Sequence, residues 1–179
     1  MRLFHFSDDA GIARFEPRPV LKPSPRPLGR DWLNGPLVWA IEDRRQAMYL
    51  FPRDCPRIVL WPTEATTDAD RDRFWRGGSW ATIAYVEEAW LEAIARATLY
   101  RYDLPPETFE TLDDAGMWIS RAPVAPLRMA AIDDLPAALA EQAVALRPLP
   151  SLAPLRDVWS TTLHASGVRL RNAKDWPAD

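Results

Sequence analysis

His5 is the residue whose position most clearly allows chemistry. It lies in residues 2–6, where alternating side chains predict a short strand. A histidine in the middle of a strand can have one ring nitrogen fixed by the backbone while the other donates to a ligand hydroxyl, such as that of a ribose. The alternative is a core histidine whose two nitrogens are both satisfied within the protein. The sequence leaves both interpretations open.

Other common catalytic centres find little support in the sequence. His5 and His164 are far apart and Cys55 is the one cysteine, so we expect no metal site built from several histidines or cysteines. Asp54 precedes Cys55, and an adjacent acid raises the pKa of a thiol, which favours an inert structural cysteine. The sequence contains no phosphate-binding glycine loop, dinucleotide fingerprint or serine-nucleophile elbow.

Composition narrows the class of protein. With 47% hydrophobic and 26% charged residues among 179, the chain has the composition of an ordinary soluble globular protein. Its 22 basic and 25 acidic residues give a net charge of -3, which argues against general nucleic-acid binding because that usually needs a basic face. No apolar run is long enough to cross a membrane or to act as a signal peptide. We therefore expect a cytoplasmic protein that does not bind membranes.

Hydrophobic spacing and proline positions predict short strands mixed with helices. The Pro-rich residues 17–36 predict a long ordered loop. We expect further strands at residues 38–41, 57–61, 98–102, 117–120 and 127–132. We expect helices at residues 42–51, 67–75, from Ser79 to about Ile94, from Asp133 or Asp134 to about Leu146, and from about Leu155 to Gly167. This mixed order is typical of the α+β class.

The order of these segments resembles that of the ADP-ribosyltransferase fold. The segments that carry the resemblance are LFHFS at residues 3–7, VWAI at 38–41, AMY at 47–49, LYRYD at 99–103 and WISRAPV at 118–124. They are most similar to the small bacterial enzymes that ADP-ribosylate rifampicin, and less similar to RNA 2'-phosphotransferases. The whole chain also looks like an uncharacterised bacterial family that shares the His-Phe-Ser opening and the PRDCPR segment at residues 52–57.

The resemblance implies an α+β fold and a division of the chain. It implies split antiparallel sheets with peripheral helices over residues 1–132, and a C-terminal helical extension at residues 133–179 packed on that domain. The short helical turn that follows the first strand in this fold would start after Ser7.

The resemblance also implies a site. In that fold NAD binds in a cleft as a substrate, and an acid stabilises the cationic sugar as nicotinamide leaves. By resemblance, His5 and Ser7 would hold the ribose, Trp39 and Tyr49 would stack on the nicotinamide, and Arg18 would cover the diphosphate from the Pro-rich loop.

The acid would come from the segment that follows the strand at residues 98–102. The candidates are Asp103, Asp113 and Asp114. We therefore expect NAD-dependent transfer of ADP-ribose to an unidentified acceptor, with a small-molecule nucleotide as the partner. Trp39 stands where the family has a tyrosine, and the later strands lack a Glu-x-Glu motif. These departures keep an alternative open, which is a non-catalytic nucleotide- or protein-binding module that retains the fold without activity.

Overall fold

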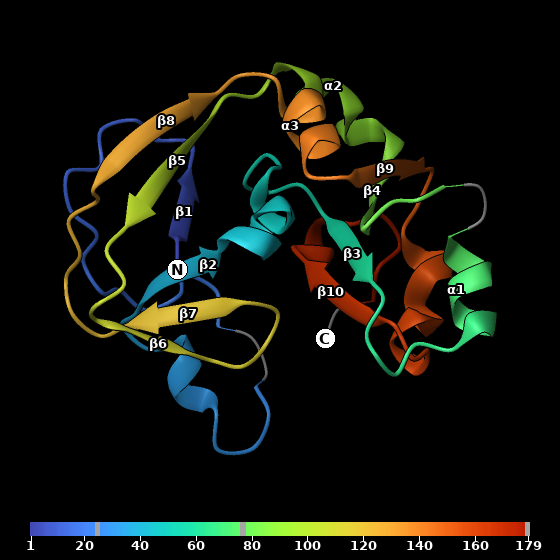
Figure 1. The fold of residues 1–179 in the computed structure, drawn as a ribbon, viewed down its shortest axis with the longest axis horizontal. Coiled ribbons are helices and arrows are strands. Elements are labelled where there is room, and N and C mark those ends of the chain that lie inside the picture. Colours follow the sequence, from blue (N-terminus) through green and yellow to red (C-terminus); the bar gives the residue numbers. More distant parts are fainter. Residues whose placement is uncertain (24–25, 76–77, 178–179) are drawn as a thin grey trace. The chain divides into compact units, whose positions relative to one another are not determined.

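The chain forms two compact units, each built on one sheet. The computed structural model describes residues 1–23, 26–75 and 78–177. Unit 1 comprises Met1–Gln46 and Leu99–Ala131, and unit 2 comprises Ala47–Thr98 and Ile132–Asp179. Both units combine a sheet with short helices, so the α+β class expected from the sequence is confirmed (Figure 1).

Unit 1 contains a six-stranded sheet in the order β6-β7-β2-β1-β5-β8. Its strands are β1 (Leu3–Ser7), β2 (Val38–Glu42), β5 (Leu99–Leu104), β6 (Phe109–Thr111), β7 (Met117–Ser120) and β8 (Arg128–Ile132). β1 lies between β2 and β5 and is antiparallel to both. The 3-10 helix η1 (Asp31–Asn34) precedes β2, and η2 (Asp43–Tyr49) follows it.

Side chains of β1 alternate between the two faces of this sheet, as strand geometry requires. Leu3 packs with Val38 and Tyr102 on one side of the sheet. His5 follows Leu3 by two residues and therefore lies on the same side, which is called the His5 face. Phe4 lies on the opposite side, together with its strand partner Ile41, and this side is called the Phe4 face. Both Leu3 and Phe4 are buried, so each face is covered.

Unit 2 contains a four-stranded sheet in the order β10-β3-β4-β9. Its strands are β3 (Arg57–Trp61), β4 (Thr82–Glu87), β9 (Val144–Leu149) and β10 (His164–Val168). The β4–β9 pair is parallel and the other two pairs are antiparallel. Its helices are α1 (Asp68–Phe74), η3 (Glu88–Trp90), α2 (Leu91–Arg96), α3 (Leu135–Glu141), η4 (Ala153–Ser160) and η5 (Leu170–Asn172).

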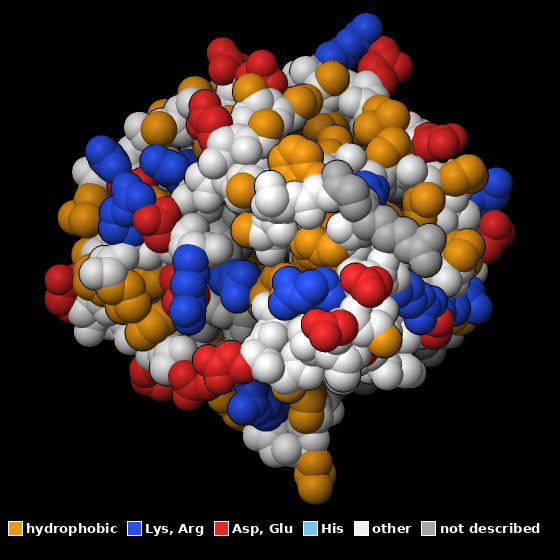
Figure 2. Space-filling view, turned by 45° about the vertical axis from the view of Figure 1, so that its right-hand side comes forward, with side chains coloured by type: hydrophobic (Ala, Val, Ile, Leu, Met, Phe, Trp, Pro, Cys, Tyr) orange, Lys and Arg blue, Asp and Glu red, His pale blue; other side chains and the backbone are white. Residues whose placement is uncertain are grey.

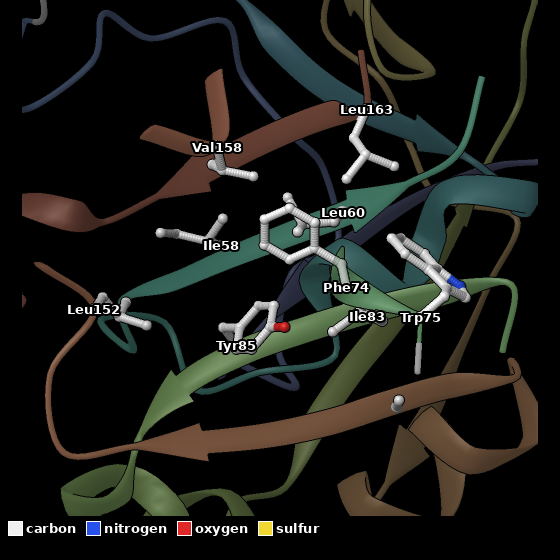
Figure 3. Packing of buried hydrophobic residues seen from close by; sticks show 10 residues of the cluster. Ile58, Leu60, Phe74, Trp75, Ile83, Tyr85, Leu152, Val158 and Leu163 are labelled. Carbon is white, nitrogen blue, oxygen red and sulfur yellow. The ribbon is translucent and has the colours of Figure 1, made fainter. Parts of the chain in front are cut away.

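One face of the unit 2 sheet is covered by a cluster of buried apolar side chains. Side chains of β3 and β4 meet residues from the end of α1 and from the η4 region (Figure 3). The labelled members are Ile58, Leu60, Phe74, Trp75, Ile83, Tyr85, Leu152, Val158 and Leu163. Every residue of β3 is buried, so this strand contributes apolar contacts to both sides of the sheet.

Several expected elements are confirmed. The strands at residues 38–41, 57–61 and 117–120 are present with ends that differ by at most one residue. The charged helix after Thr67 is present as α1, and the Thr67 side chain caps it by accepting from the Asp70 amide. Asp134 caps α3 in the same way. Gly77, which follows the helix expected at residues 67–75, lies outside the described residues.

The helix expected from Ser79 to Ile94 is wrong, because its first half is strand β4. Five of the six β4 residues are buried. A strand covered on both faces shows no alternation, so its apolar residues also fit a helical spacing. Only the end of the expected segment is helical, as η3 and α2.

Two strands near the C-terminus were not expected. α3 ends at Glu141, where Ala143 has a positive φ of 53°, and the chain then enters β9. The last expected helix is wrong in its second half, because η4 ends at Ser160 and β10 follows. The helix expected at residues 42–51 is present as the 3-10 helix at residues 43–49. Within the described residues, every helix falls short of the length and hydropathy needed to cross a membrane.

The buried cluster of unit 2 predicts a large cost for truncating Leu60, which is 0% exposed. Leu60→Ala should lower the free energy of unfolding by about 2–5 kcal/mol, because it removes buried methyl groups and leaves a cavity. Urea denaturation would measure this. Leu127→Ala is the control, since Leu127 is 70% exposed and the change should stay within about 0.5 kcal/mol. Similar losses in both variants would contradict this packing.

Candidate functional site

His5 is held in place by a bond to the neighbouring strand. Its Nδ1 lies 2.8 Å from the carbonyl oxygen of Trp39. The residues of β1 that pair with β2 are Leu3 and Phe4. His5 is the next residue, so its imidazole contacts the backbone of β2 just beyond these pairs. A carbonyl oxygen only accepts, so Nδ1 donates, and Nε2 of the neutral ring is then an acceptor. The expected backbone contact of one ring nitrogen is therefore observed.

An aromatic ring packs against the imidazole on the His5 face. The ring of Phe15 lies 4.6 Å from that of His5, and Tyr102 is the partner of His5 on β5. Phe15 also packs edge-on against Tyr102 at 5.3 Å. His5 itself is partly buried. The site thus combines a fixed acceptor nitrogen with flat apolar walls.

The loop after β1 is tied down by hydrogen bonds to its own sheet. Ser7 lies on the His5 face, is buried, and its Oγ accepts from the Asp9 amide at 3.1 Å. The hydroxyl of Tyr102 donates to the Asp9 carbonyl at 2.7 Å and accepts from the Ile12 amide at 3.2 Å. These bonds form a turn where the resemblance implied a short helix. Ser7 therefore lies beside His5, with its hydroxyl used by this turn.

Neither Trp39 nor Tyr49, the two residues expected to stack on the nicotinamide, contributes its ring to the His5 face of unit 1. Trp39 offers its carbonyl to His5, but its ring packs on the Phe4 face beside Ile119, with the guanidinium of Arg26 5.9 Å from the ring centre. Tyr49 belongs to unit 2, where its ring lies 5.7 Å from the guanidinium carbon of Arg57. The structure therefore does not provide the Trp39 ring as a wall for a ligand at His5.

Asp103 lies on the face opposite His5. Its strand partner is Phe4, whereas His5 pairs with Tyr102, so alternation separates the carboxylate from the imidazole. Its Oδ2 accepts from Nε of Arg128 at 2.5 Å, and its Oδ1 is 3.6 Å from Nε of Arg101. The geometry assigns Asp103 an ion pair on the Phe4 face.

Asp113 and Asp114 form the turn between β6 and β7. Asp113 has a positive φ of 52°, and its amide donates to the Thr111 hydroxyl at 3.0 Å. The carbonyl of Asp114 accepts from the Met117 amide at 2.9 Å. Gly116 follows with a φ of 72° at a point where a Cβ would lie 2.6 Å from Glu42 Cγ. Both aspartates are exposed and serve the hairpin, so neither lies beside His5 in this sheet.

Arg18 anchors the Pro-rich loop to the start of β2. Its carbonyl accepts from the Leu37 amide at 3.2 Å, and its exposed side chain extends from this isolated bridge. The backbone of Arg18 thus has a structural role. The resemblance also implies a contact between its guanidinium and a diphosphate, which the structure does not test.

Trp118 is a residue of the His5 face that the sequence analysis did not assign a role. It pairs with Ala40, which belongs to the same core cluster as Leu3. Its Nε1 is buried and has no hydrogen-bond partner in the described part of the chain. A buried indole N–H usually finds a partner. Counting the two-residue period in both strands could have placed Trp118 on this face once their register was known.

The arrangement on the His5 face suits recognition of hydroxyl and carbonyl groups. His5 brings an imidazole whose Nδ1 is fixed by the Trp39 carbonyl, and Trp118 brings a donor at Nε1. Among residues 1–23, 26–75 and 78–177, no three His, Cys, Asp or Glu side chains are grouped to hold a metal ion. On the surface drawn in Figure 2, Lys and Arg side chains are interspersed with Asp and Glu rather than gathered into one basic patch.

Cys55 lies in the core of unit 2 and is 0% exposed. Burial raises the pKa of its thiol to about 12, because the charged thiolate loses its hydration. Its Sγ is 3.6 Å from the Pro56 carbonyl. The inert, structural role expected for this cysteine agrees with these surroundings.

The burial of Cys55 predicts slow alkylation in the folded protein. At pH 8, iodoacetamide should modify Cys55 only after denaturation in urea, because the native thiol is inaccessible and almost fully protonated. Mass spectrometry of the intact chain would follow the reaction. Rapid labelling under native conditions, at a rate close to that of a free thiol, would contradict this placement.

Comparison with known proteins gives a family but no function. No curated protein and no solved structure matches the chain. Residues 4–173 match a family of unknown function, DUF6886, which covers both units. The chain therefore belongs to the DUF6886 family.

Proposed function

We propose that unit 1 is a nucleotide-binding module that holds NAD by a ribose on the His5 face and does not transfer ADP-ribose. The observation that carries this proposal is the 2.8 Å bond between Nδ1 of His5 and the Trp39 carbonyl. It fixes the ring orientation and makes Nε2 an acceptor, so a ribose hydroxyl would donate to it. The reverse polarity would require a charged imidazole.

Two further features support a nucleotide as the ligand. Phe15 and Tyr102 give the imidazole apolar walls, and such walls with a few fixed polar groups are typical of small-molecule sites. Nε1 of Trp118 adds a buried donor on the same face. The choice of NAD among nucleotides comes from the resemblance of the LFHFS and VWAI segments to the ADP-ribosyltransferase fold.

The positions of the three candidate acids favour binding over transfer. ADP-ribosyl transfer needs a carboxylate beside the sugar carbon that becomes cationic. Asp103 is on the opposite face and is paired with Arg128, while Asp113 and Asp114 build a hairpin turn. Glu42 shares the His5 face, but its side chain lies over Gly116 and pairs with Arg44. These four acidic residues therefore have structural partners of their own.

A thermal melt with NAD tests the proposal. At 1 mM NAD, a dissociation constant of about 10 μM would stabilise the wild type by about 2.7 kcal/mol, which raises Tm by about 5–10 °C. His5→Ala should lose most of this shift because it removes the oriented acceptor. His164→Ala is the matched control, since it changes the other histidine, in unit 2, and should keep the shift.

The same samples should release no nicotinamide. An unshifted wild-type melt, or an equal shift in His5→Ala, would contradict the binding site. Nicotinamide release by the wild type that is lost in Asp103→Ala or Asp113→Ala would instead establish ADP-ribosyl transfer as the function.

A further inference from the structure

β8 (Arg128–Ile132) is an outer strand of the unit 1 sheet. The sheet order places β5 on one side of it, and no described strand lies on its other side (Figure 1). A strand at a sheet edge presents a row of unpaired N–H and C=O groups that can pair with another strand. The other outer strand of this sheet, β6, has three residues, whereas β8 has five. β8 is therefore the longer edge of this sheet.

One hydrogen bond shows which backbone groups of β8 face its free edge. The Leu127 amide donates to the Asp103 carbonyl on β5 at 2.8 Å. In a strand, the N–H and C=O groups of successive residues point to opposite edges. The backbone groups of the next residue therefore point away from β5, and those of every second residue after it do the same. The residues whose N–H and C=O groups face the free edge are Arg128, Ala130 and Ile132.

The side chains along β8 give this edge little protection. Natural sheets usually guard an outer strand with charged residues, a proline or a bulge. β8 contains no proline, and Arg128 is its one charged residue. Nε of Arg128 binds the Asp103 carboxylate of the same sheet at 2.5 Å. Met129 is 42% exposed and Ala131 is exposed as well, so the edge combines open backbone groups with small or apolar side chains.

The sequence of β8 fits a second copy of the same strand. Arg128 begins the strand, and the acidic residues Asp133 and Asp134 directly follow it. When two copies run antiparallel, the basic start of each strand lies beside the acidic end of the other, whereas parallel copies would bring like charges together. If the two copies of Ala130 pair, Arg128 of each copy lies opposite Ile132 of the other. The strands then overlap along their whole length, and the backbone groups that face the free edge meet one another.

We propose that β8 is the interface of a homodimer, in which the β8 strands of two copies pair antiparallel across a two-fold axis. This axis is perpendicular to the sheet, because it must reverse the strand direction and keep the two strands side by side. The pairing joins two six-stranded sheets into one and places the His5 faces of both copies on the same side. It also closes the free edge. The interface is independent of the function proposed for His5.

Light scattering coupled to size-exclusion chromatography tests this interface. Wild-type protein at about 100 μM should have twice the mass of one chain, and a dilution series gives the dissociation constant. Ala130→Pro removes an N–H group that faces the free edge and that pairing with β5 does not use, so the chain should still fold. It should raise the dissociation constant about 10-fold or more. Ala130→Ser is the matched control, since it keeps the amide and should dimerise like the wild type.

Met129→Glu is the second variant. It places like charges from the two copies near the two-fold axis and close to Asp133, so it should also raise the dissociation constant about 10-fold or more. Circular dichroism would show that each variant is folded, and if Ala130→Pro does not fold, Met129→Glu decides.

Three results would overturn the proposal. These are a wild-type mass of one chain at about 100 μM, a mass above that of two chains, and an unchanged dissociation constant in either folded variant. His5→Ala should remain dimeric, which distinguishes a failure here from a failure of the NAD proposal.

Discussion

The strict alternation of side chains along β1 determines what can meet in unit 1. His5 and Phe4 are adjacent in sequence but lie on opposite faces, and each brings its β5 partner with it. Tyr102 therefore joins the imidazole, and Asp103 joins Phe4. A slip of one residue would exchange the faces and would break the packing of the buried side chains of Leu3 and Phe4, so the core fixes the register. The separation of the imidazole from the Asp103 carboxylate is thus a consequence of the core.

Two arginines that lie over aromatic rings differ in the groups that surround their positive charge. Arg101 lies over Phe4, with its guanidinium carbon 4.6 Å from the ring centre, and has Asp103 within 3.6 Å as a counter-charge. Arg57 lies over Phe51 and Tyr49, and its hydrogen bonds within the described residues go to two carbonyl oxygens. In the first arrangement the charge is paired within unit 1, although Nε of Arg101 and Oδ1 of Asp103 are buried without a hydrogen-bond partner in the described residues. In the second, carbonyl dipoles and ring faces surround a guanidinium whose pKa burial lowers to about 10.

The sequence predicted the strands that carry the sites because their signals are local. Residues 57–61 are rich in β-branched and aromatic side chains and end at a proline, and the strand has these bounds. The backbone contact of His5 was also expected, since a strand residue always has a neighbouring backbone within reach. β4, β9 and β10 were missed because their pairings join segments far apart in sequence, and Pro148 lies inside β9.

The site was less predictable than the strands. Face assignment needs the register between strands, which no single segment encodes, so the sequence could not separate His5 from Asp103. It also gave no reason to expect Trp118 on the His5 face or the burial of Arg57. Both features arise from long-range pairing. The type of a residue and its local sequence pattern indicate what chemistry its side chain can do. The register of the sheet decides which of these side chains lie together on one face.

The tautomer of His5 is the most direct measure of this account. A long-range proton–nitrogen NMR spectrum of ¹⁵N-labelled protein at pH 8, with the signals of the two histidines assigned through His164→Gln, would report which ring nitrogen carries the proton. The bond to the Trp39 carbonyl predicts a proton on Nδ1 and an unprotonated Nε2 in His5. A proton found on Nε2, with Nδ1 bare, would contradict it.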